Sequence, residues 1–351
     1  NMPESIEFGK LVVGNKSPAF IIAEVGVNHN GDLNLAKDLI YKAAECGANC
    51  VKFQTFKAER VVLADAPKAH YQLKTTDAEE SQLQMLKKLE LDRAFYEEVI
   101  DCCDRAGVFF MSTPYNDEDL EFLENLQVKA YKLASIHAAE PNFAAQVAST
   151  GKPVILSTGM ATLAEIDQTL RAIRHTGNNK VILLQCTTNY PSNAEDTNLL
   201  AMQTMRDVFG VLAGYSDHTT GEVACIASIA LGAKVIEKHF TLDKSLPGPD
   251  HTSSSEPDEF ASLVEKIRQT EKCLGSSFKR PCDVEIKNAV GMRRSIVAKK
   301  DIHIGTVLKN EHLTFKRPGT GLSPALLGEI LGKKIRKEVA SDQLINWSDI
   351  E

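Results

Sequence analysis

The sequence predicts an α/β protein: a (β/α)8 TIM barrel followed by a small β-rich domain. Short apolar runs alternate eight times with amphipathic segments, and this alternation stops after Leu274. The runs are almost continuously apolar, which is typical of parallel strands that are buried on both faces. The chain has 351 residues, enough for a barrel of about 250 residues and a second domain.

The predicted strands are rich in Val, Ile, Phe and Leu and are short enough for a barrel. Between them, segment 33–46 has the apolar stripe of a helix, segment 257–274 repeats it, and Asp92 suits a helix N-cap. A doubly wound open sheet is the alternative to a barrel, but no GxGxxG sequence follows the first strand. The strands are predicted at residues 19–28, 50–56, 108–114, 130–135, 153–159, 180–188, 211–219 and 233–242.

Three parts follow from this pattern. A catalytic barrel domain is expected at residues 1–275, a linker at 276–290 and the β-rich domain at 291–351. One connection inside the barrel domain, residues 57–80, is long and polar. Loops of this length within a compact domain are usually either functional or disordered.

Composition excludes several classes of partner. Net charge is -7 and no basic tract stands out, so a nucleic acid is not expected to bind. No apolar run approaches the roughly 18 residues of a membrane span, and no basic-then-apolar leader is present. The eight cysteines form no CxxC pair, which favours reduced thiols in a cytoplasmic protein over a disulfide framework.

Polar residues end the predicted strands, where barrel enzymes carry their chemistry. Lys52 and Lys132 stand in two of these strands among apolar neighbours. A buried lysine is costly unless it is paired, so we expect both to point into the barrel mouth. Beside several hydroxyls they would form a cradle for phosphate or carboxylate. The alternative is that each lysine extends to solvent.

Two histidines and two carboxylates complete the pattern. His218 and His239 end consecutive strands, so their imidazoles should lie side by side and suit a divalent transition metal. Hydrogen-bonded structural histidines are the alternative. Glu24 stands in an otherwise apolar strand and must be paired or act as an acid or base. Asp250 lies on the loop after the last strand and could reach the same mouth.

The strand ends carry a series of short motifs along nearly the whole chain. They are IAEVGVNHNG (22–31), VKFQ (51–54), STP (112–114), YK (131–132), LSTGM (156–160), QCT (185–187), GYSDH (214–218), EKHFT (237–241) and GPDH (248–251). In this order they resemble the sialic acid synthases, a group that includes the legionaminic and pseudaminic acid synthases. The small domain, with Lys316-Arg317-Pro318-Gly319, resembles the family's antifreeze-like SAF domain.

The resemblance implies that His218 and His239 hold a divalent metal, usually Mn²⁺. It implies that a phosphoenolpyruvate molecule is surrounded by Lys52, Thr113, Lys132, Ser135, Ser157 and Ser216. The sugar would be contacted by Gln54, Tyr190, Asp250 and Arg317. We expect the catalytic residues to be Glu24, Lys52, Lys132 and His239. Family members are domain-swapped homodimers, so Arg317 would complete the partner subunit's site.

One position departs from the family. Where the family has an acidic residue that contacts the sugar, two positions after Ser135, this chain has His137. The identity of the sugar therefore stays open. Segments 71–76 and 80–85 resemble those of the bacterial legionaminic acid branch.

The implied function is a nonulosonic acid synthase. It would condense phosphoenolpyruvate with an N-acetylated hexosamine aldehyde, either N-acetylmannosamine or a 2,4-diacetamido-trideoxy analogue, and release phosphate. A first alternative is another phosphoenolpyruvate-dependent keto-acid sugar synthase, which would need an arginine-rich site, and the strand ends contain no arginine. A second is a non-catalytic homologue in polysaccharide biosynthesis, with His137 marking lost catalysis.

Overall fold

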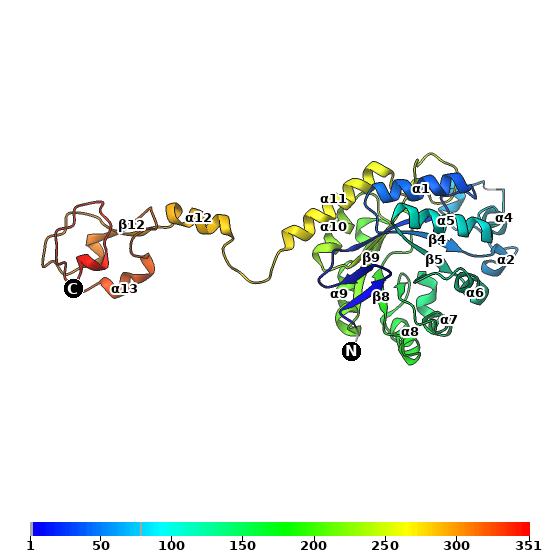
Figure 1. Ribbon diagram of the computed structural model, residues 1–351, viewed down its shortest axis with the longest axis horizontal. Helices are drawn as coiled ribbons and strands as arrows, with labels where there is room; N and C mark the ends of the chain where they lie inside the picture. The colour runs from blue at the N-terminus through cyan, green and yellow to red at the C-terminus, as the bar shows by residue number, and fades with distance from the viewer. Residues whose placement is uncertain (1–2, 78) are drawn as a thin grey trace. The chain divides into compact units, whose positions relative to one another are not determined.

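The computed structural model describes residues 3–77 and 79–351. The chain divides into two compact units, Asn1–Gly275 and Ser276–Glu351. In the first unit the described strands close into a parallel barrel in the order β10-β3-β4-β5-β6-β7-β8-β9 (Figure 1), which confirms the predicted TIM barrel. The barrel strands are β3 (Phe20–Gly26), β4 (Cys50–Thr55), β5 (Phe109–Pro114), β6 (Tyr131–Leu133), β7 (Val154–Ser157), β8 (Val181–Gln185), β9 (Leu212–Asp217) and β10 (Val235–His239).

Helices surround the barrel and bury their apolar faces against the outer side of the strands. Asp92 caps α5 as predicted, because its carboxylate accepts a hydrogen bond from Phe95 N at 2.8 Å. Asp32 caps α1 in the same way. The surrounding helices are α1 (Leu33–Glu45), α5 (Arg93–Ala106), α6 (Asp117–Asn125), α7 (Pro141–Ala148), α8 (Leu163–His175), α9 (Leu200–Phe209), α10 (Val223–Ala230) and α11 (Pro257–Leu274).

The amino-terminal end of the barrel is filled by apolar side chains. A hairpin of β1 (Ser5–Phe8) and β2 (Leu11–Gly14) packs there, and the Phe8 ring lies 5.3 Å from that of Phe20. Inside the strands, Ile22, Ile155 and other buried residues continue this cluster. Each such side chain stabilises the fold by roughly 1.5–3 kcal/mol through burial. The interior is therefore packed at this end, and polar residues gather at the opposite end.

The long connection after β4 is folded. It forms the short helices α2 (Ala58–Val61), α3 (Gln72–Thr75) and α4 (Gln82–Lys87) before α5 begins. Ser81 caps α4 through a reciprocal pair of hydrogen bonds with Gln84. We refer to residues 57–90, of which residue 78 lies outside the described residues, as the β4–α5 segment.

The second unit has its own core, made by Ile296, Leu308, Ile345 and other apolar residues. Its described regular elements are α12 (Asp283–Met292), β11 (Ser295–Ala298), β12 (Leu313–Lys316) and α13 (Leu327–Ile330). Helix α12 occupies part of the predicted linker, because Cys282 and Glu285 form a capping arrangement that starts a helix there. Throughout the described ranges, no helix combines the length and apolarity needed to cross a membrane.

Candidate functional site

A cavity of about 260 Å³ lies at the carboxyl ends of the barrel strands. All the residues predicted for the site line it except Arg317, which belongs to the second unit and donates from Nε to Met292 O at 3.1 Å. The predicted residues that line the cavity are Glu24, Lys52, Gln54, Thr113, Lys132, Ser135, Ser157, Tyr190, Ser216, His218, His239 and Asp250.

Two buried lysines line this cavity from β4 and β6. Lys52 is 4% exposed and Lys132 is 2% exposed, so neither extends to solvent. Lys132 Nζ donates to Ser157 Oγ at 2.7 Å, and Lys52 Nζ lies 3.5 Å from Thr113 Oγ1. Cations held beside hydroxyls in a desolvated cavity bind an anionic group strongly.

Glu237, on β10, lies between the two lysines and was not predicted as a site residue. Its Oε2 is 3.7 Å from Lys52 Nζ, and its Oε1 is 3.6 Å from Lys132 Nζ. Ser216 Oγ donates to Oε1 at 2.9 Å. Burial acts to raise the pKa of Glu237, but the two lysines outweigh burial and hold that pKa below its ordinary value. Strand alternation could have identified Glu237, because residues two apart share a face with His239.

Glu24, on β3, contacts the first of these lysines. Its Oε2 lies 2.9 Å from Lys52 Nζ, and its Oε1 accepts from Gln54 Nε2 at 3.0 Å. Burial raises the pKa of Glu24, although Lys52 opposes the shift, and the nearby negative charge of Glu237 raises it further. Gly26 has a φ of +56°, and a Cβ there would lie 3.0 Å from Glu24 Oε1. A glycine at this position therefore keeps the carboxylate free to occupy the cavity.

The two histidines lie side by side, with ring centroids 5.5 Å apart. His218 Nδ1 lies 2.5 Å from Thr187 O, so Nδ1 carries the proton and the Nε2 lone pair is left for a ligand. Burial lowers the pKa of His218, and burial with the charges of His218 and Lys52 lowers the pKa of His239 to about 3. Both imidazoles are therefore neutral at physiological pH.

These imidazoles fit a divalent metal. Within the described ranges, no group of three or more His, Cys, Asp or Glu side chains gathers to hold an ion. The available protein ligands are thus His218 and His239, with Asp250 Oδ2 4.0 Å from His239 Nδ1. Two neutral imidazoles leave coordination positions for water and substrate, as transition metals in open sites require.

The predicted residues Gln54 and Tyr190 form another part of the cavity wall, together with Tyr115 and Cys186, which were not predicted as site residues. The Tyr190 ring lies 4.1 Å from the His218 ring, and Tyr115 OH donates to Gln54 Oε1 at 3.4 Å. Cys186 also lines the cavity, and its Sγ lies 3.2 Å from Ser135 Oγ. The polar and aromatic groups of this wall can orient a hydroxylated or N-acetylated substrate.

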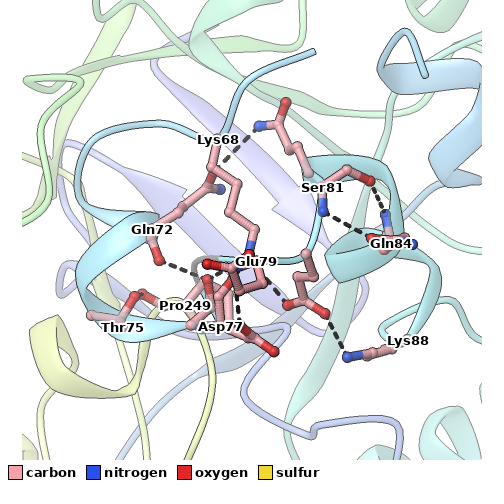
Figure 2. A network of polar contacts seen from close by, with 12 residues as sticks. Lys68, Gln72, Thr75, Asp77, Glu79, Ser81, Gln84, Lys88 and Pro249 are labelled. Atoms are coloured by element: carbon pink, nitrogen blue, oxygen red, sulfur yellow. Dashed lines mark hydrogen bonds and ion pairs between the residues drawn. The ribbon is translucent and has the colours of Figure 1, made fainter. Parts of the chain in front are cut away.

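The β4–α5 segment supplies lining residues that sequence reasoning missed: Tyr71, Gln72, Gln82 and Met85. Its fold depends on Lys68, whose side chain is 1% exposed and does not line the cavity. Figure 2 shows the Lys68 ammonium among oxygens of the segment, which are Thr76 Oγ1 at 2.9 Å, Asp77 O at 2.5 Å and Glu80 Oε1 at 3.2 Å.

A tether then joins the β4–α5 segment to the loop that carries Asp250. Thr75 Oγ1 donates to Pro249 O at 3.3 Å (Figure 2). The Tyr71 ring also lies 5.3 Å from that of Tyr190. The segment is thereby fixed beside Tyr190 and the loop that carries Asp250.

His137 does not line the cavity. It is fully buried, its Nδ1 accepts from Ala134 N at 3.1 Å, and its ring packs 4.9 Å from that of Phe143. His137, which replaces the acidic residue of the family, therefore packs behind Tyr115, and the centroids of the two rings are 5.8 Å apart.

Comparisons with known proteins agree with this architecture. The NeuB family model matches residues 39–279, and the SAF domain model matches residues 293–351. The N,N'-diacetyllegionaminic acid synthase of Campylobacter jejuni is 47% identical over 93% of this chain and 98% of its own length. The protein of the same name from Legionella pneumophila is 42% identical over 96% of each chain.

Solved structures show the same likeness. The crystal structure of an N-acetylneuraminic acid synthetase from Leptospira borgpetersenii superposes with a TM-score of 0.74 at 33% identity. The match covers 82% of this chain and 95% of that one. These matches confirm the resemblance drawn from the sequence motifs. The chain therefore belongs to the NeuB family and carries a SAF domain at its carboxyl end.

Proposed function

We propose that this protein is a metal-dependent nonulosonic acid synthase. It condenses phosphoenolpyruvate with an N-acetylated hexosamine aldehyde, forms a carbon–carbon bond and releases phosphate. The observation that carries the proposal is the convergence of Lys52, Lys132, their hydroxyl partners and the paired histidines on one cavity. The names of the relatives, which are legionaminic, pseudaminic and sialic acid synthases, support the same reaction class.

The two lysines are the proposed site for the phosphate and carboxylate of phosphoenolpyruvate. Glu237 lies near both of them and offsets one positive charge. Burial raises the pKa of Glu24, so its ionised carboxylate is a strong enough base to accept a proton during the reaction. Thr113, Ser157 and Ser216 add neutral donors at the same place. In such a cluster the lysines and hydroxyls can bind an anion, while the carboxylate of Glu237 reduces the repulsion between the two ammonium groups.

The sugar-side wall favours an unphosphorylated substrate. The described lining residues of the β4–α5 segment include neither arginine nor lysine, and the Arg317 proposed below belongs to the second unit of the partner subunit. The segment contributes amide groups and apolar side chains instead, namely Val61, Val62, Tyr71, Gln72, Gln82, Met85, Leu86 and Leu89. Such a surface suits acetamido and methyl groups, so we propose a 2,4-diacetamido-2,4,6-trideoxyhexose as the preferred sugar.

The residues divide the chemistry between them. Lys52, Lys132 and Ser157 hold phosphoenolpyruvate so that its C3 faces the aldehyde carbon, to which the new bond forms. Tyr190, Gln54 and Asp250 orient the open-chain sugar. A divalent ion at His218 and His239, proposed as Mn²⁺, supplies Lewis-acid polarisation of the aldehyde oxygen when it is bound.

Glu24 completes the reaction. As C3 bonds to the aldehyde, positive character develops at C2, and Glu24 orients a water molecule there and takes its proton. The resulting tetrahedral centre carries a hydroxyl at C2. Its bond from C2 to the bridging oxygen breaks, and phosphate leaves with that oxygen and with the hydroxyl proton. The lysines stabilise the departing phosphate, and a keto group remains at C2. The aldehyde oxygen ends as a hydroxyl, because it receives the proton that Glu24 took from water, and this returns Glu24 to its ionised form.

We further propose a homodimer in which Arg317 contacts the sugar in the partner subunit. Arg317 is exposed in the second unit, and the apolar side chains of Ile286 and Val290, which lie four residues apart on one face of α12, are more than half exposed. A helix with such a face is typical of a subunit interface.

The test is phosphate release from phosphoenolpyruvate in the presence of Mn²⁺. N-acetylmannosamine, its 6-phosphate and 2,4-diacetamido-2,4,6-trideoxymannose would be compared, each with and without a chelator. Release that is fastest with the trideoxy sugar and abolished by the chelator supports the proposal. Release with N-acetylmannosamine 6-phosphate alone would refute the argument from the apolar wall. No release with any sugar would favour a non-catalytic protein.

A further inference from the structure

A buried ion pair joins β9 to β10 on the side of the strands that faces away from the cavity. Asp217 and Lys238 are Cα partners in the parallel pairing of these strands, and Lys238 Nζ lies 2.6 Å from Asp217 Oδ2. The two side chains are 0% and 6% exposed. Neither residue lines the cavity.

Side chains alternate between the two faces of a strand, so the residue pairs before and after this ion pair point toward the cavity. On one side lie Ser216 and Glu237, which are also Cα partners. On the other side lie His218 and His239, each directly following one member of the pair. The register of β9 against β10 at the ion pair therefore sets the relative position of the two imidazoles.

Packing alone does not explain why the buried positions 217 and 238 carry charged side chains. On the Asp217 side the outward neighbours include apolar core residues such as Ala213, Ile236 and Ile229 of α10, and Cys225 Sγ donates to Asp217 Oδ2 at 3.2 Å. Lys238 also lines a second cavity with polar residues that include Thr219, Glu222 and Glu259. Removing two charges from water costs several kcal/mol per ion, and a well-packed apolar pair is often at least as stable. The pair is accordingly expected to serve a purpose other than stability.

The hydrogen bonds of the pair converge on the residue after His218. Asp217 Oδ1 accepts from Thr219 N at 2.9 Å and from Thr219 Oγ1 at 2.8 Å, and Tyr215 OH donates to it at 3.0 Å. Lys238 Nζ donates to Thr219 O at 2.9 Å. Thr219 is thus held at its N–H, its hydroxyl and its carbonyl by one strand-to-strand pair.

His218 itself is held by two further hydrogen bonds, from residues that follow β8. Ser192 N donates to His218 O at 2.9 Å, and Thr187 O fixes the imidazole through Nδ1. With Thr219 clamped as well, the backbone around His218 has little freedom. His239 lies on β10, whose backbone pairs with β9, and Ser255 N donates to His239 O at 2.8 Å. The bond between Lys238 and Asp217 adds a buried side-chain link between the strands that carry the two imidazoles.

We propose that Asp217 and Lys238 form a positioning pair that holds His218 and His239 at the spacing a divalent metal ion requires. The inference rests on the metal-dependent function proposed above, and neither residue contacts the substrate cavity. Outer-shell groups of this kind typically change metal affinity by 10–100-fold when they are removed.

The test is Mn²⁺ binding to the full chain with both charges removed, in the variant Asp217→Asn/Lys238→Met. The neutral pair keeps side-chain volume and acceptors for Thr219, so the fold is expected to persist. The Mn²⁺ dissociation constant, measured from the electron paramagnetic resonance signal of free Mn²⁺, should rise at least about 10-fold. The absorption bands of the Co²⁺ form should also shift.

Two further variants sharpen the result. Thr219→Ala removes only one donor to Asp217 and should weaken Mn²⁺ binding by a smaller factor, which provides a measurement if the double variant does not fold. Glu124→Gln/Lys152→Met neutralises a different ion pair on the outside of the barrel, with Nζ and Oε1 2.5 Å apart, and should leave the dissociation constant unchanged.

The possible results distinguish failure of the positioning role from failure of the proposed metal-dependent function. If the wild-type protein binds Mn²⁺ tightly and both Asp217–Lys238 network variants bind it equally well, the positioning role is wrong and the proposed function stands. If the wild-type protein does not bind Mn²⁺, the metal-dependent function and the positioning role are both wrong. Recovery of kcat in the double variant at saturating Mn²⁺ would confirm that the pair acts through the metal.

Discussion

The ammonium of Lys52 lies 2.9 Å from the carboxylate of Glu24, and the two side chains are 6% and 1% exposed. This contact joins the proposed anion cradle to the proposed base. Lys52 also lies near Glu237, so it keeps a negative partner when Glu24 changes its charge. The arrangement allows Glu24 to exchange a proton without leaving a buried lysine unpaired.

Replacing Glu24 by Gln should abolish turnover while the protein still folds and binds metal. The amide keeps the size of the side chain and its contact with Gln54, but it cannot accept a proton from water. We expect kcat to fall at least about 100-fold, the usual contribution of a general base. Glu124→Gln, on α6 away from the cavity, is the matched control, and near-normal turnover in Glu24→Gln would remove Glu24 from the mechanism.

Replacing Lys68 by Met should raise KM for the sugar about 10-fold and leave KM for phosphoenolpyruvate unchanged. The ammonium that orders the β4–α5 segment would be lost, and Tyr71 and Gln72 would leave their places on the sugar-side wall, which costs about 1.4 kcal/mol of sugar binding. Lys88→Met is the control, because Lys88 contacts the same Glu80 at 2.5 Å but is 69% exposed. Equal KM values for Lys68→Met and the control would contradict a positioning role for the segment.

Mixing two inactive variants should restore activity if Arg317 acts in the partner subunit. In a mixed dimer of Arg317→Ala and Glu24→Gln, one barrel keeps its own Glu24 and receives an intact Arg317 from its partner. Random exchange of equal amounts should restore about a quarter of wild-type activity, because half the dimers are mixed and each contains one complete site. Absence of recovery after demonstrated subunit exchange would show that Arg317 acts within its own chain or not at all.

Deleting the chain from Gly291 onward should remove activity while the barrel stays folded, since the first unit has its own core. Circular dichroism and thermal unfolding would check the fold of the truncated protein. Full activity in that protein would refute a site shared with the second unit.

Buried neutral histidines should make the fold sensitive to acid. Burial lowers the pKa of His137 to about 4 from its ordinary value of 6.5. The unfolded chain therefore binds a proton first as the pH falls, so the contribution of His137 to stability is complete above about pH 6.5 and is lost progressively toward pH 4.

His137→Gln isolates this effect. A glutamine at the third helical position can still accept the Ala134 hydrogen bond but does not titrate. Between pH 6 and 4.5, urea unfolding of the variant should show a dependence on pH that is smaller by up to about 1.4 kcal/mol per pH unit. An identical pH dependence in the two proteins would show that His137 is not buried in its neutral form.

The sequence predicted the barrel and most of the cavity for a physical reason. Strand alternation and the rule that barrel chemistry lies at the carboxyl ends of the strands place Lys52, Lys132, His218 and His239 on one rim from the sequence alone. Glu237 follows the same alternation, because it lies two residues before His239 on β10. It was not predicted as a site residue because the metal-binding interpretation of this strand rested on His239 alone.

Other features had no periodic signal. Tyr71 and Gln72 reach the cavity because Lys68 folds an irregular segment, and such tertiary contacts leave no regular spacing in the sequence. The sequence identified His137 as the residue that departs from the family pattern, but it did not predict that His137 is buried behind Tyr115 and does not line the cavity. Helix α12 lies partly in the segment that was predicted to be a linker. None of its residues is buried in this chain, so the segment has no core-facing apolar stripe by which a sequence pattern could identify a helix.

The most direct test of the central claim follows the oxygen that bridges C2 and phosphorus in phosphoenolpyruvate. With that oxygen replaced by ¹⁸O and with Mn²⁺ and the trideoxy sugar present, water attack at C2 predicts that the label appears in the released phosphate. The keto acid product should carry oxygen from solvent instead. Label retained in the product would mean that water attacks phosphorus, and would contradict the assignment of Glu24 and of the cavity as a whole.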